Sequence, residues 1–328
     1  MSKNLITLLK VLISVGLAGG LLYLVFQNIE WDAFWERAKT VDYTWVVASI
    51  LLSVLAFVIR AYRWNILLEP LGYNLKTSRT TLAVLVGYLA NLALPRLGEI
   101  TRCGILKKND DVAIPSALGS VVTERIIDVL TLLLLILLSL ALESDRLLRF
   151  LSTAYQDLHI PNYVAAMIVA GGIIGVIALV LFIKRQDKLQ GKFASLLKGF
   201  VAGFLSLRNI KRPIGFLFST VMLWVVYYLM SYIIIFSIPE TSHLGLGAGF
   251  MLLVTGGIAL ALPVQSGFGT YHGMIAGMLL LYSIDQTTGV FLATLLHTSQ
   301  ILAIALFGSI ALIVSFVIRR KTARKETN

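Results

Sequence analysis

Residues 92–102 read LALPRLGEITR, and residues 260–272 read LALPVQSGFGTYH. Each stretch interrupts a long apolar run, at 81–106 and at 246–282, with a proline, glycines and polar side chains. Proline and glycine break helices, so each run should contain two helical pieces. We therefore expect two helical hairpins, each with both ends on one side of a membrane, whether the hairpin re-enters the membrane or crosses it twice.

The rest of the chain has the composition of a multi-pass membrane protein. Of its 328 residues, 58% are hydrophobic and 14% are charged, and the mean hydropathy is +0.86, which excludes a soluble enzyme. Apolar runs of about 20 residues match the hydrocarbon thickness for a helix, and the alternation of a barrel is absent. The expected spanning helices, besides the hairpins, are 6–26, 43–68, 116–142, 163–183, 213–238 and 289–318.

The predicted helices fall into two halves with the same order. The shared letters LALP are 168 residues apart, and the same shift places helix 43–68 on helix 213–238. Each half contains three crossings, an odd number, so the second half should be inserted upside down. We predict an all-α polytopic membrane protein, one domain over 1–328, built as an inverted repeat of about 1–160 and about 161–318. Each half has three spanning helices and a broken hairpin, an arrangement that in transporters marks a site near the midplane.

Charge indicates the orientation. The net charge is +11. Basic residues are concentrated in the segments between predicted helices that lie on the same side of the membrane, above all the linker 184–212 and the tail 319–328. By the positive-inside rule these segments and both termini are cytoplasmic, in a bacterial cytoplasmic (inner) membrane. The linker also has the pattern of an amphipathic helix on anionic lipid. Topology and lipid attraction explain the charge, so no nucleic-acid partner is expected.

Six charged residues are predicted at membrane depth. Three lie at or just after the first hairpin tip and three on the helix 116–142, and they are Arg96, Glu99, Arg102, Glu124, Arg125 and Asp128. Charges at that depth cost at least about 2.5–3.5 kcal/mol each, so they should face the protein interior or a wet cavity. Two interpretations stay open: the charges neutralise one another and fix the hairpin to the helix, or their guanidinium groups bind a lipid phosphate.

The second tip offers a different set of polar groups. Its candidates are Gln265, Ser266, Gly267, Gly269, Tyr271 and His272. If the next helix starts near Thr270, its free N–H groups form an anion site beside these side chains. The alternative is that the glycines only permit a sharp turn and that His272 is a satisfied interior histidine.

Other residues point less to function. Arg60 and Arg63, with Tyr62 and Trp64, are expected to end a helix at the cytoplasmic interface, where such side chains snorkel. Cys103 is expected to be a small buried residue. One cysteine and four histidines exclude a disulfide framework and zinc motifs, and no nucleotide motif occurs, so we assign no metal, cofactor or catalytic residue.

Two motifs carry a family resemblance. The segment 95–102, PRLGEITR, followed by 120–128, SVVTERIID, resembles the lysylphosphatidylglycerol synthase transmembrane-domain family, also called flippase-like. In that family's best-known member this module is thought to move aminoacylated phospholipid between leaflets, while a soluble domain makes the lipid. The chain stops soon after its last helix, so we expect a stand-alone member without the synthase domain. Where the family often has Pro-Gly-Gly-x-Gly followed by Glu, this chain has 265–269 and then His272.

The sequence therefore predicts a lipid translocase and not an enzyme. Its partners would be membrane lipids with an anionic or aminoacylated head group, held in a polar cavity between the inverted halves. Two alternatives remain. One is a membrane-embedded enzyme that acts on a lipid phosphate with Glu124 or Asp128 as base, and the other is a scaffold for a separate lipid-modifying enzyme.

Overall fold

The computed structural model describes residues 19–27, 29–94, 97–146, 210–262 and 264–326, and the single positions 16, 148, 149 and 152. Within these residues all regular structure is helical, as predicted. The α-helices are α2 (Trp31–Thr40), α3 (Tyr43–Leu68), α4 (Thr77–Ala93), α5 (Leu97–Asp110), α6 (Ile114–Leu142), α10 (Pro213–Ile233), α11 (Leu246–Ala261), α12 (Thr270–Leu280) and α13 (Gln286–Glu326). Short 3-10 turns cover Glu69–Leu71, Ile234–Ser237 and Gln265–Gly267. The predicted helix 163–183, most of the linker 184–212, and Pro95 and Arg96 lie outside the described residues.

Among the residues that the structure describes, three helical stretches are long and apolar enough to cross a membrane, and they are Tyr43–Leu71, Pro213–Ser237 and Gln286–Val317. These agree with three of the predicted spans. The last helix is longer than predicted, because α13 continues through the basic segment that was expected to form a separate tail at 319. A run of arginine and lysine is compatible with a helix, since both residues have high helix propensity.

Both interrupted runs break at the predicted place. Helix α4 ends at Ala93 and Leu94 is extended, with φ −142° and ψ 132°. Helix α11 ends at Ala261, and Leu262 is extended in the same way, with ψ 146°. Each of these leucines precedes a proline in the sequence, and the residue before a proline disfavours the helical region. The chain becomes helical again at Leu97 in α5 and at Thr270 in α12.

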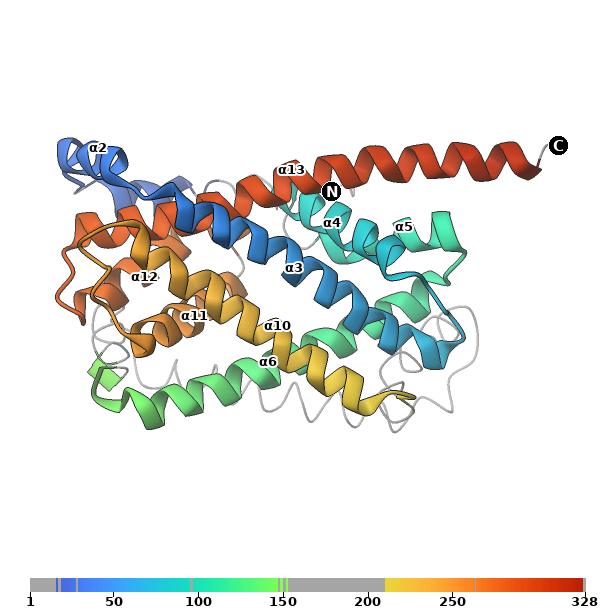
Figure 1. The fold of residues 1–328 in the computed structure, drawn as a ribbon, viewed down its shortest axis with the longest axis horizontal. Coiled ribbons are helices and arrows are strands. Elements are labelled where there is room, and N and C mark those ends of the chain that lie inside the picture. The colour runs from blue at the N-terminus through green and yellow to red at the C-terminus, as the bar shows by residue number, and fades with distance from the viewer. Residues whose placement is uncertain are drawn as a thin grey trace, which may run out of the picture.

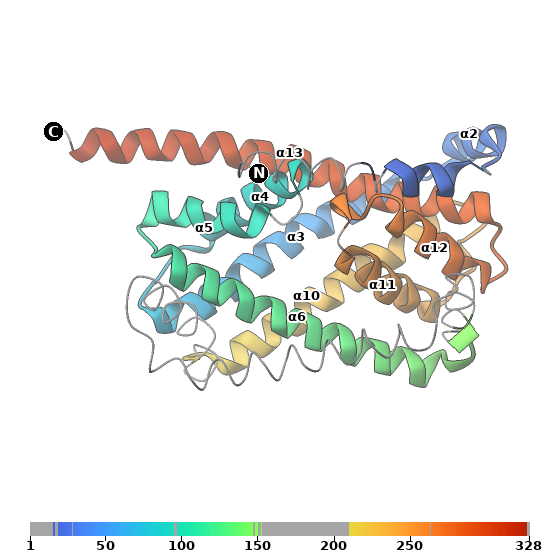
Figure 2. The same cartoon turned by 180° about the vertical axis from the view of Figure 1, so that it is seen from behind.

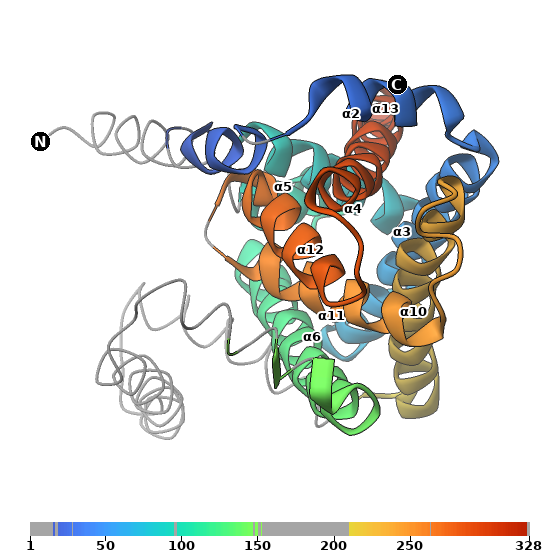
Figure 3. The same cartoon turned by 90° about the vertical axis from the view of Figure 1, so that its left-hand side faces the viewer.

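The two pairs of broken helices lie towards opposite ends of the molecule. Helices α4 and α5 pack against each other near one end of the long axis, and α11 and α12 near the other (Figures 1 and 2). Helices α3 and α10 run side by side obliquely between the two ends and make extensive contact. The view along the long axis shows α13 on one side of the bundle and α6 on the opposite side (Figure 3).

The buried core is divided between the same two ends. One apolar cluster joins α11, α12 and the start of α13, and includes Met251, Ile275 and Leu292. A second joins the end of α3 to α4, α5 and the start of α6, and includes Trp64 and Leu106. Large apolar side chains also remain exposed along the outer faces of α3, α6, α10 and α13. Such a surface suits a lipid environment and not water.

Candidate functional site

Glu124, on α6, is the centre of a buried ion-pair network. Its side chain is 0% exposed. Its Oε1 atom lies 2.6 Å from Nε of Arg60 and 3.3 Å from Nη2 of Arg63, both on α3. Its Oε2 atom lies 2.9 Å from Nη1 of Arg102 on α5. One carboxylate therefore holds three helices together.

Asp128 stands one turn further along α6 on the same face. Its oxygens lie 2.8 Å from Nη2 of Arg60 and 2.6 Å from Nη2 of Arg63. A further ion pair of 2.9 Å joins Arg125 on α6 to Glu99 on α5, and both side chains are partly exposed. The predicted link between the first hairpin and the helix 116–142 is thus present.

The expectation for Arg60 and Arg63 was wrong. Their side chains are 5% and 0% exposed, and they pair with acidic residues instead of snorkelling to the interface. Trp64 is also buried, and its Nε1 atom donates to Oγ of Ser120 at 2.8 Å. Removing either partner of such a buried ion pair would leave an uncompensated charge, so these arginines and carboxylates depend on one another inside the protein.

These two arginines change the charge balance of the site. Among the described residues of the network, four guanidinium groups face three carboxylates, and these are Arg60, Arg63, Arg102 and Arg125 against Glu99, Glu124 and Asp128. Arg96, the other predicted site residue at the first tip, lies outside the described residues. The network therefore carries a surplus of one positive charge in a largely buried place.

Several guanidinium nitrogens in the network have no partner in the described part of the chain. They are Nε and Nη1 of Arg63 and Nη2 of Arg102, all buried. Each of them is a donor, because an ionised guanidinium has no acceptor. Buried donors without partners are rare in native proteins and call for a ligand or water.

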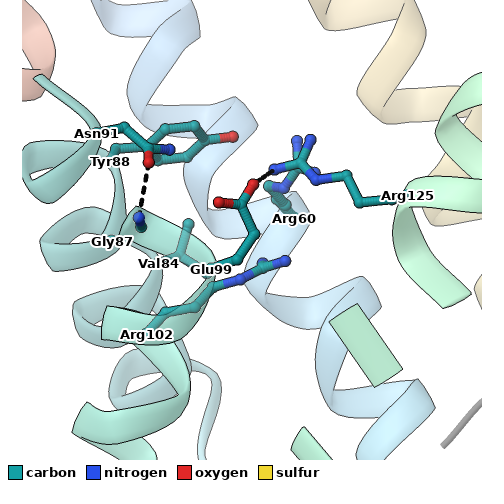
Figure 4. Close-up of a pocket in the computed structure, with 9 residues that line it drawn as sticks. Arg60, Val84, Gly87, Tyr88, Asn91, Glu99, Arg102 and Arg125 are labelled. Carbon is teal, nitrogen blue, oxygen red and sulfur yellow. Dashed lines mark hydrogen bonds and ion pairs between the residues drawn. The ribbon is translucent and has the colours of Figure 1, made fainter. Parts of the chain in front are cut away.

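A small pocket opens beside Arg102, whose Nη2 is one of these donors, whereas Arg63 is not among its lining residues (Figure 4). Its lining comes from α3, α4, α5 and α6, and consists of Arg60, Val84, Gly87, Tyr88, Asn91, Gly98, Glu99, Arg102 and Arg125. The empty volume is about 210 Å³, but the centre of a water molecule fits in only about 10 Å³ of it. A lipid head group is much larger than one water, so the pocket must widen to admit it.

The second tip contacts the end of the first hairpin's leading helix. The side-chain amide of Gln265 donates to the carbonyl oxygen of Leu92 at 2.9 Å and to that of Asn91 at 3.4 Å. The hydroxyl of Ser266 also donates to the Asn91 carbonyl, at 3.4 Å. Asn91 in turn accepts the backbone N–H of Gly98 on its side chain. The two tips are therefore hydrogen-bonded to each other through the last turn of α4.

Aromatic and imidazole rings surround the second tip. The rings of His272 and His297 lie 5.1 Å apart, and His297 stacks on Tyr271 at 5.0 Å. Nε2 of His297 lies 2.9 Å from the carbonyl oxygen of Ser266. His297, on α13, thus belongs to the same cluster as the predicted residues of the second tip.

Two glycines of the second tip adopt backbone angles that residues with a side chain rarely adopt. Gly267 and Gly269 have φ of +74° and +81°, which favour glycine. A Cβ atom on Gly269 would also overlap the backbone at Leu21 and Leu22. Helix α12 starts at Thr270 as predicted. The glycines therefore form the turn and allow the first helical segment to approach it, as the structural interpretation of this tip expected.

The structure gathers the predicted residues into two groups and adds two that the sequence analysis had set aside. Arg60 and Arg63 lie inside the predicted helix 43–68, three residues apart, and their acidic partners are four apart on another predicted helix. Complementary charges within two predicted spans were therefore a usable signal. In the described part of the chain, no group of three or more His, Cys, Asp or Glu side chains could hold a metal ion.

Comparisons with known proteins agree with a membrane role. Residues 8–319 match a family model described as the lysylphosphatidylglycerol synthase TM region. The chain is 22% identical to glycosyltransferase AglD of Haloferax volcanii over 86% of this chain and 50% of that protein, so it spans about half of that relative. It is also 22% identical to UPF0104 membrane protein MJ1595 of Methanocaldococcus jannaschii, over 86% of this chain and 87% of that protein. No solved structure matches the chain.

Proposed function

This chain belongs to the family of the lysylphosphatidylglycerol synthase transmembrane region, and on that premise we propose that it moves a lipid with an anionic head group between the two leaflets of its membrane. The family and the two relatives link the chain to lipid or glycan handling at a membrane. Transport across the bilayer is the further step that we infer from the site.

The observation that carries the proposal is the unbalanced guanidinium cluster. Four arginines against three carboxylates leave one positive charge, and three buried donors of Arg63 and Arg102 have no partner in the described part of the chain. A phosphate group in the pocket would neutralise the surplus and accept a hydrogen bond from Nη2 of Arg102, whose side chain lines the pocket. Aminoacylated phospholipids retain that phosphate and fall within the same proposal.

The positions of the helices support the inverted repeat as the transport framework. Adding 168 to the bounds of α4, 77–93, gives 245–261, and α11 spans Leu246–Ala261. Adding 168 to those of α3, 43–68, gives 211–236, and α10 spans Pro213–Ile233. The two broken pairs lie towards opposite ends of the molecule (Figure 2). In our proposal the halves rock about the contact between the tips, with both termini in the cytoplasm.

We propose transport and not catalysis because the carboxylates are occupied. Glu124 and Asp128 each pair with three arginines, and Glu99 pairs with one. A carboxylate held by guanidinium groups is a weak general base. The relative named a glycosyltransferase favours one second candidate, in which the chain handles a sugar-bearing lipid, alone or beside a separate lipid-modifying enzyme.

The test is lipid transfer in proteoliposomes with labelled phosphatidylglycerol and, as a neutral-charge comparison, phosphatidylcholine. We expect the wild type to move phosphatidylglycerol and Arg102→Gln to move it at least about tenfold more slowly. The control is Arg37→Gln, a cation of α2 that pairs with Glu240 and Asp285 away from the site, and it should transport normally.

Both variants are checked for a wild-type melting temperature before transfer is compared. A folded wild type that moves no lipid faster than empty liposomes, across anionic, aminoacylated and sugar-bearing lipids, would rule out the translocase. Formation of a new lipid product by the pure protein would favour an enzyme. Faster transfer of a sugar-bearing lipid than of phosphatidylglycerol would favour the second candidate.

A further inference from the structure

The second tip contains buried hydrogen-bond acceptors without partners in the described residues, whereas the unpartnered guanidinium nitrogen of Arg102 at the arginine pocket is a donor. The amide nitrogen of Gln265 donates to the carbonyls of Leu92 and Asn91, which fixes the orientation of the amide. Its Oε1 atom is consequently left as an acceptor, and it is buried with no partner in the described residues. Gln265 as a whole is 8% exposed.

The hydrogen-bonding of His297 defines its tautomer. A carbonyl oxygen can only accept, so Nε2 of His297 carries the hydrogen that it donates to Ser266. In the neutral ring Nδ1 is then an acceptor, and it is buried without a partner in the described part of the chain. Nδ1 of the neighbouring His272 is also buried without a partner in the described part of the chain, where no hydrogen bond fixes the tautomer of that ring. The two residues are 4% and 3% exposed.

Two buried acceptors without partners in the described residues, Oε1 of Gln265 and Nδ1 of His297, lie in one cluster and imply a missing hydrogen-bond donor. Native proteins satisfy nearly all such atoms, and an unsatisfied one is costly. The donor is a hydroxyl or an ammonium group. Among the described residues no carboxylate acts electrostatically on either imidazole. A buried ammonium needs a carboxylate partner, so the cluster suits a neutral hydroxyl.

One residue connects this cluster to the arginine pocket. Asn91 lines the pocket, and its carbonyl oxygen accepts from Gln265 and from Ser266. Asn91 is therefore shared by the wall of the pocket and by the hydrogen bonds of the second tip, and a head group that extends from the pocket past Asn91 would meet the cluster. Among the buried atoms without partners in the described residues, the pocket has a donor of Arg102 and the acceptor Oε2 of Glu99, whereas the cluster has the acceptors of Gln265 and His297.

We propose that Gln265, His272 and His297 form a second subsite that binds hydroxyl groups of the head group whose phosphate occupies the arginine pocket. The substrates are then lipids with a glycerol or sugar head group, and the subsite rejects analogues without free hydroxyls. The inference rests on the proposed function only for the assumption that the ligand is a lipid.

Binding is measured first, on the purified full chain in detergent, so that the result does not depend on transport. The probes are short-chain phosphatidylglycerol and the same lipid with both glycerol hydroxyls methylated, which has the same charge. We expect the wild type to bind the free-hydroxyl lipid at least about tenfold more tightly. In His272→Phe, which keeps a ring beside Phe26, the ratio should fall to about one, while binding of the methylated lipid stays unchanged.

Two further variants separate recognition from folding. His272→Asn keeps a polar atom near the position of Nδ1 and should restore a preference of several-fold. His297→Gln keeps an amide that can donate to the Ser266 carbonyl but removes Nδ1, so it should lose the preference while it melts like the wild type. If His272→Phe does not fold, His297→Gln decides the question.

The outcomes are distinct from those of the transport test. Equal binding of the two lipids by the wild type, or an unchanged ratio in both His272→Phe and His297→Gln, would overturn the subsite and leave the translocase standing. Tighter binding of an ethanolamine or lysyl lipid than of phosphatidylglycerol would overturn the choice of a hydroxyl. Discrimination in binding without any lipid transfer would uphold the subsite and reject the translocase.

Discussion

The two broken segments each interrupt a helix before a proline, and their chemistry differs. At the first, between α4 and α5, side chains are charged, and the buried atoms without partners in the described residues include a guanidinium donor of Arg102 and the carboxylate acceptor Oε2 of Glu99. At the second, between α11 and α12, the polar side chains of the cluster are neutral, and the buried acceptors Oε1 of Gln265 and Nδ1 of His297 have no partner in the described residues. One framework therefore presents two different surfaces to the centre of the protein.

The charged residues of the first site have no charged counterparts in the second half. The residue 168 positions after each of them in the sequence is uncharged. The positions reached are Tyr228, Ser231, Gly267, Thr270, Leu292, Ala293 and Leu296, in the order of Arg60, Arg63, Glu99, Arg102, Glu124, Arg125 and Asp128. Under the proposed inverted repeat, the helix bounds match while only the first copy carries the ion pairs. The proposed phosphate site would then belong to the first half alone.

The largest expected effect comes from removing the central acid of the charged region. Glu124→Leu should destabilise the protein by about 3–5 kcal/mol, because it leaves Arg60, Arg63 and Arg102 buried with too little negative charge. The measurement is thermal unfolding in detergent, followed by tryptophan fluorescence or by size-exclusion chromatography after heating.

Glu99→Leu is the matched control, since its partner Arg125 has a side chain that is 44% exposed. A half-exposed pair contributes about 0–1 kcal/mol, so this variant should melt close to the wild type. Equal losses of stability in the two variants would mean that burial does not distinguish the ion pairs of Glu124 from the ion pair of Glu99.

The second effect concerns how closely the helices of the charged region approach each other. A Cβ atom on Gly98 would overlap the carbonyl oxygen of Gly87 and lie 2.7 Å from Cγ of Asn91. Gly98→Ala should therefore cost about 1–3 kcal/mol and push α5 away from α4. Thermal unfolding in detergent measures this loss of stability.

Gly104 lies on the same helix, and a Cβ atom added there would have nothing within 4 Å, so Gly104→Ala should be neutral or stabilising by up to about 1 kcal/mol. A loss of stability in both variants would point to helix α5 itself and not to its contact with α4.

Sequence patterns sufficed for the helices because hydropathy and proline act locally. The residue before each proline had to be extended, so the breaks after Ala93 and Ala261 were predictable to within a few residues. The full length of α13 was not, because a basic segment satisfies the positive-inside rule whether or not it is helical.

The site was less predictable because ion pairing depends on tertiary contact. Arg60 looks the same in the sequence whether it snorkels or faces Glu124, and only the packing of α3 against α6 decides between them. The interfacial expectation failed for this reason. Gln265 was found from its position at the tip, but its bond to the end of α4 depends on how the two halves meet.

A third prediction tests the contact between the two regions. Gln265→Met keeps the size of the side chain but removes its donor to the Leu92 carbonyl, so it should cost about 1 kcal/mol in thermal unfolding. Gln286→Met is the control, because Gln286 is exposed at the start of α13 and should change stability by less than about 0.5 kcal/mol. If Gln265→Met also left the stability unchanged, this hydrogen bond would not join the two tips.

The smallest effect is a pH dependence that acts on the second region only. Asp285 precedes α13, the helix that carries His297, and lies outside the spanning stretch. Burial would raise the pKa of its carboxyl, but hydrogen bonds from Thr288 and the charge of Arg37 outweigh it and lower that pKa. A lowered folded-state pKa gives stability that is present above the unfolded pKa of about 3.9 and is lost as the pH falls through the folded value.

Because the Asp285 side chain is 57% exposed, screening should keep this contribution below about 0.5 kcal/mol. Asp285→Asn should therefore melt slightly below the wild type at pH 7, and the gap should narrow as the pH falls below the unfolded pKa of about 3.9. Asparagine can still accept from the Thr288 N–H, so the variant isolates the charge from the cap. A gap that stayed constant down to pH 3 would assign the effect to packing. A closing gap would show that acid loosens the start of α13 through this carboxylate, whereas the ion pairs of Glu124 lie on other helices.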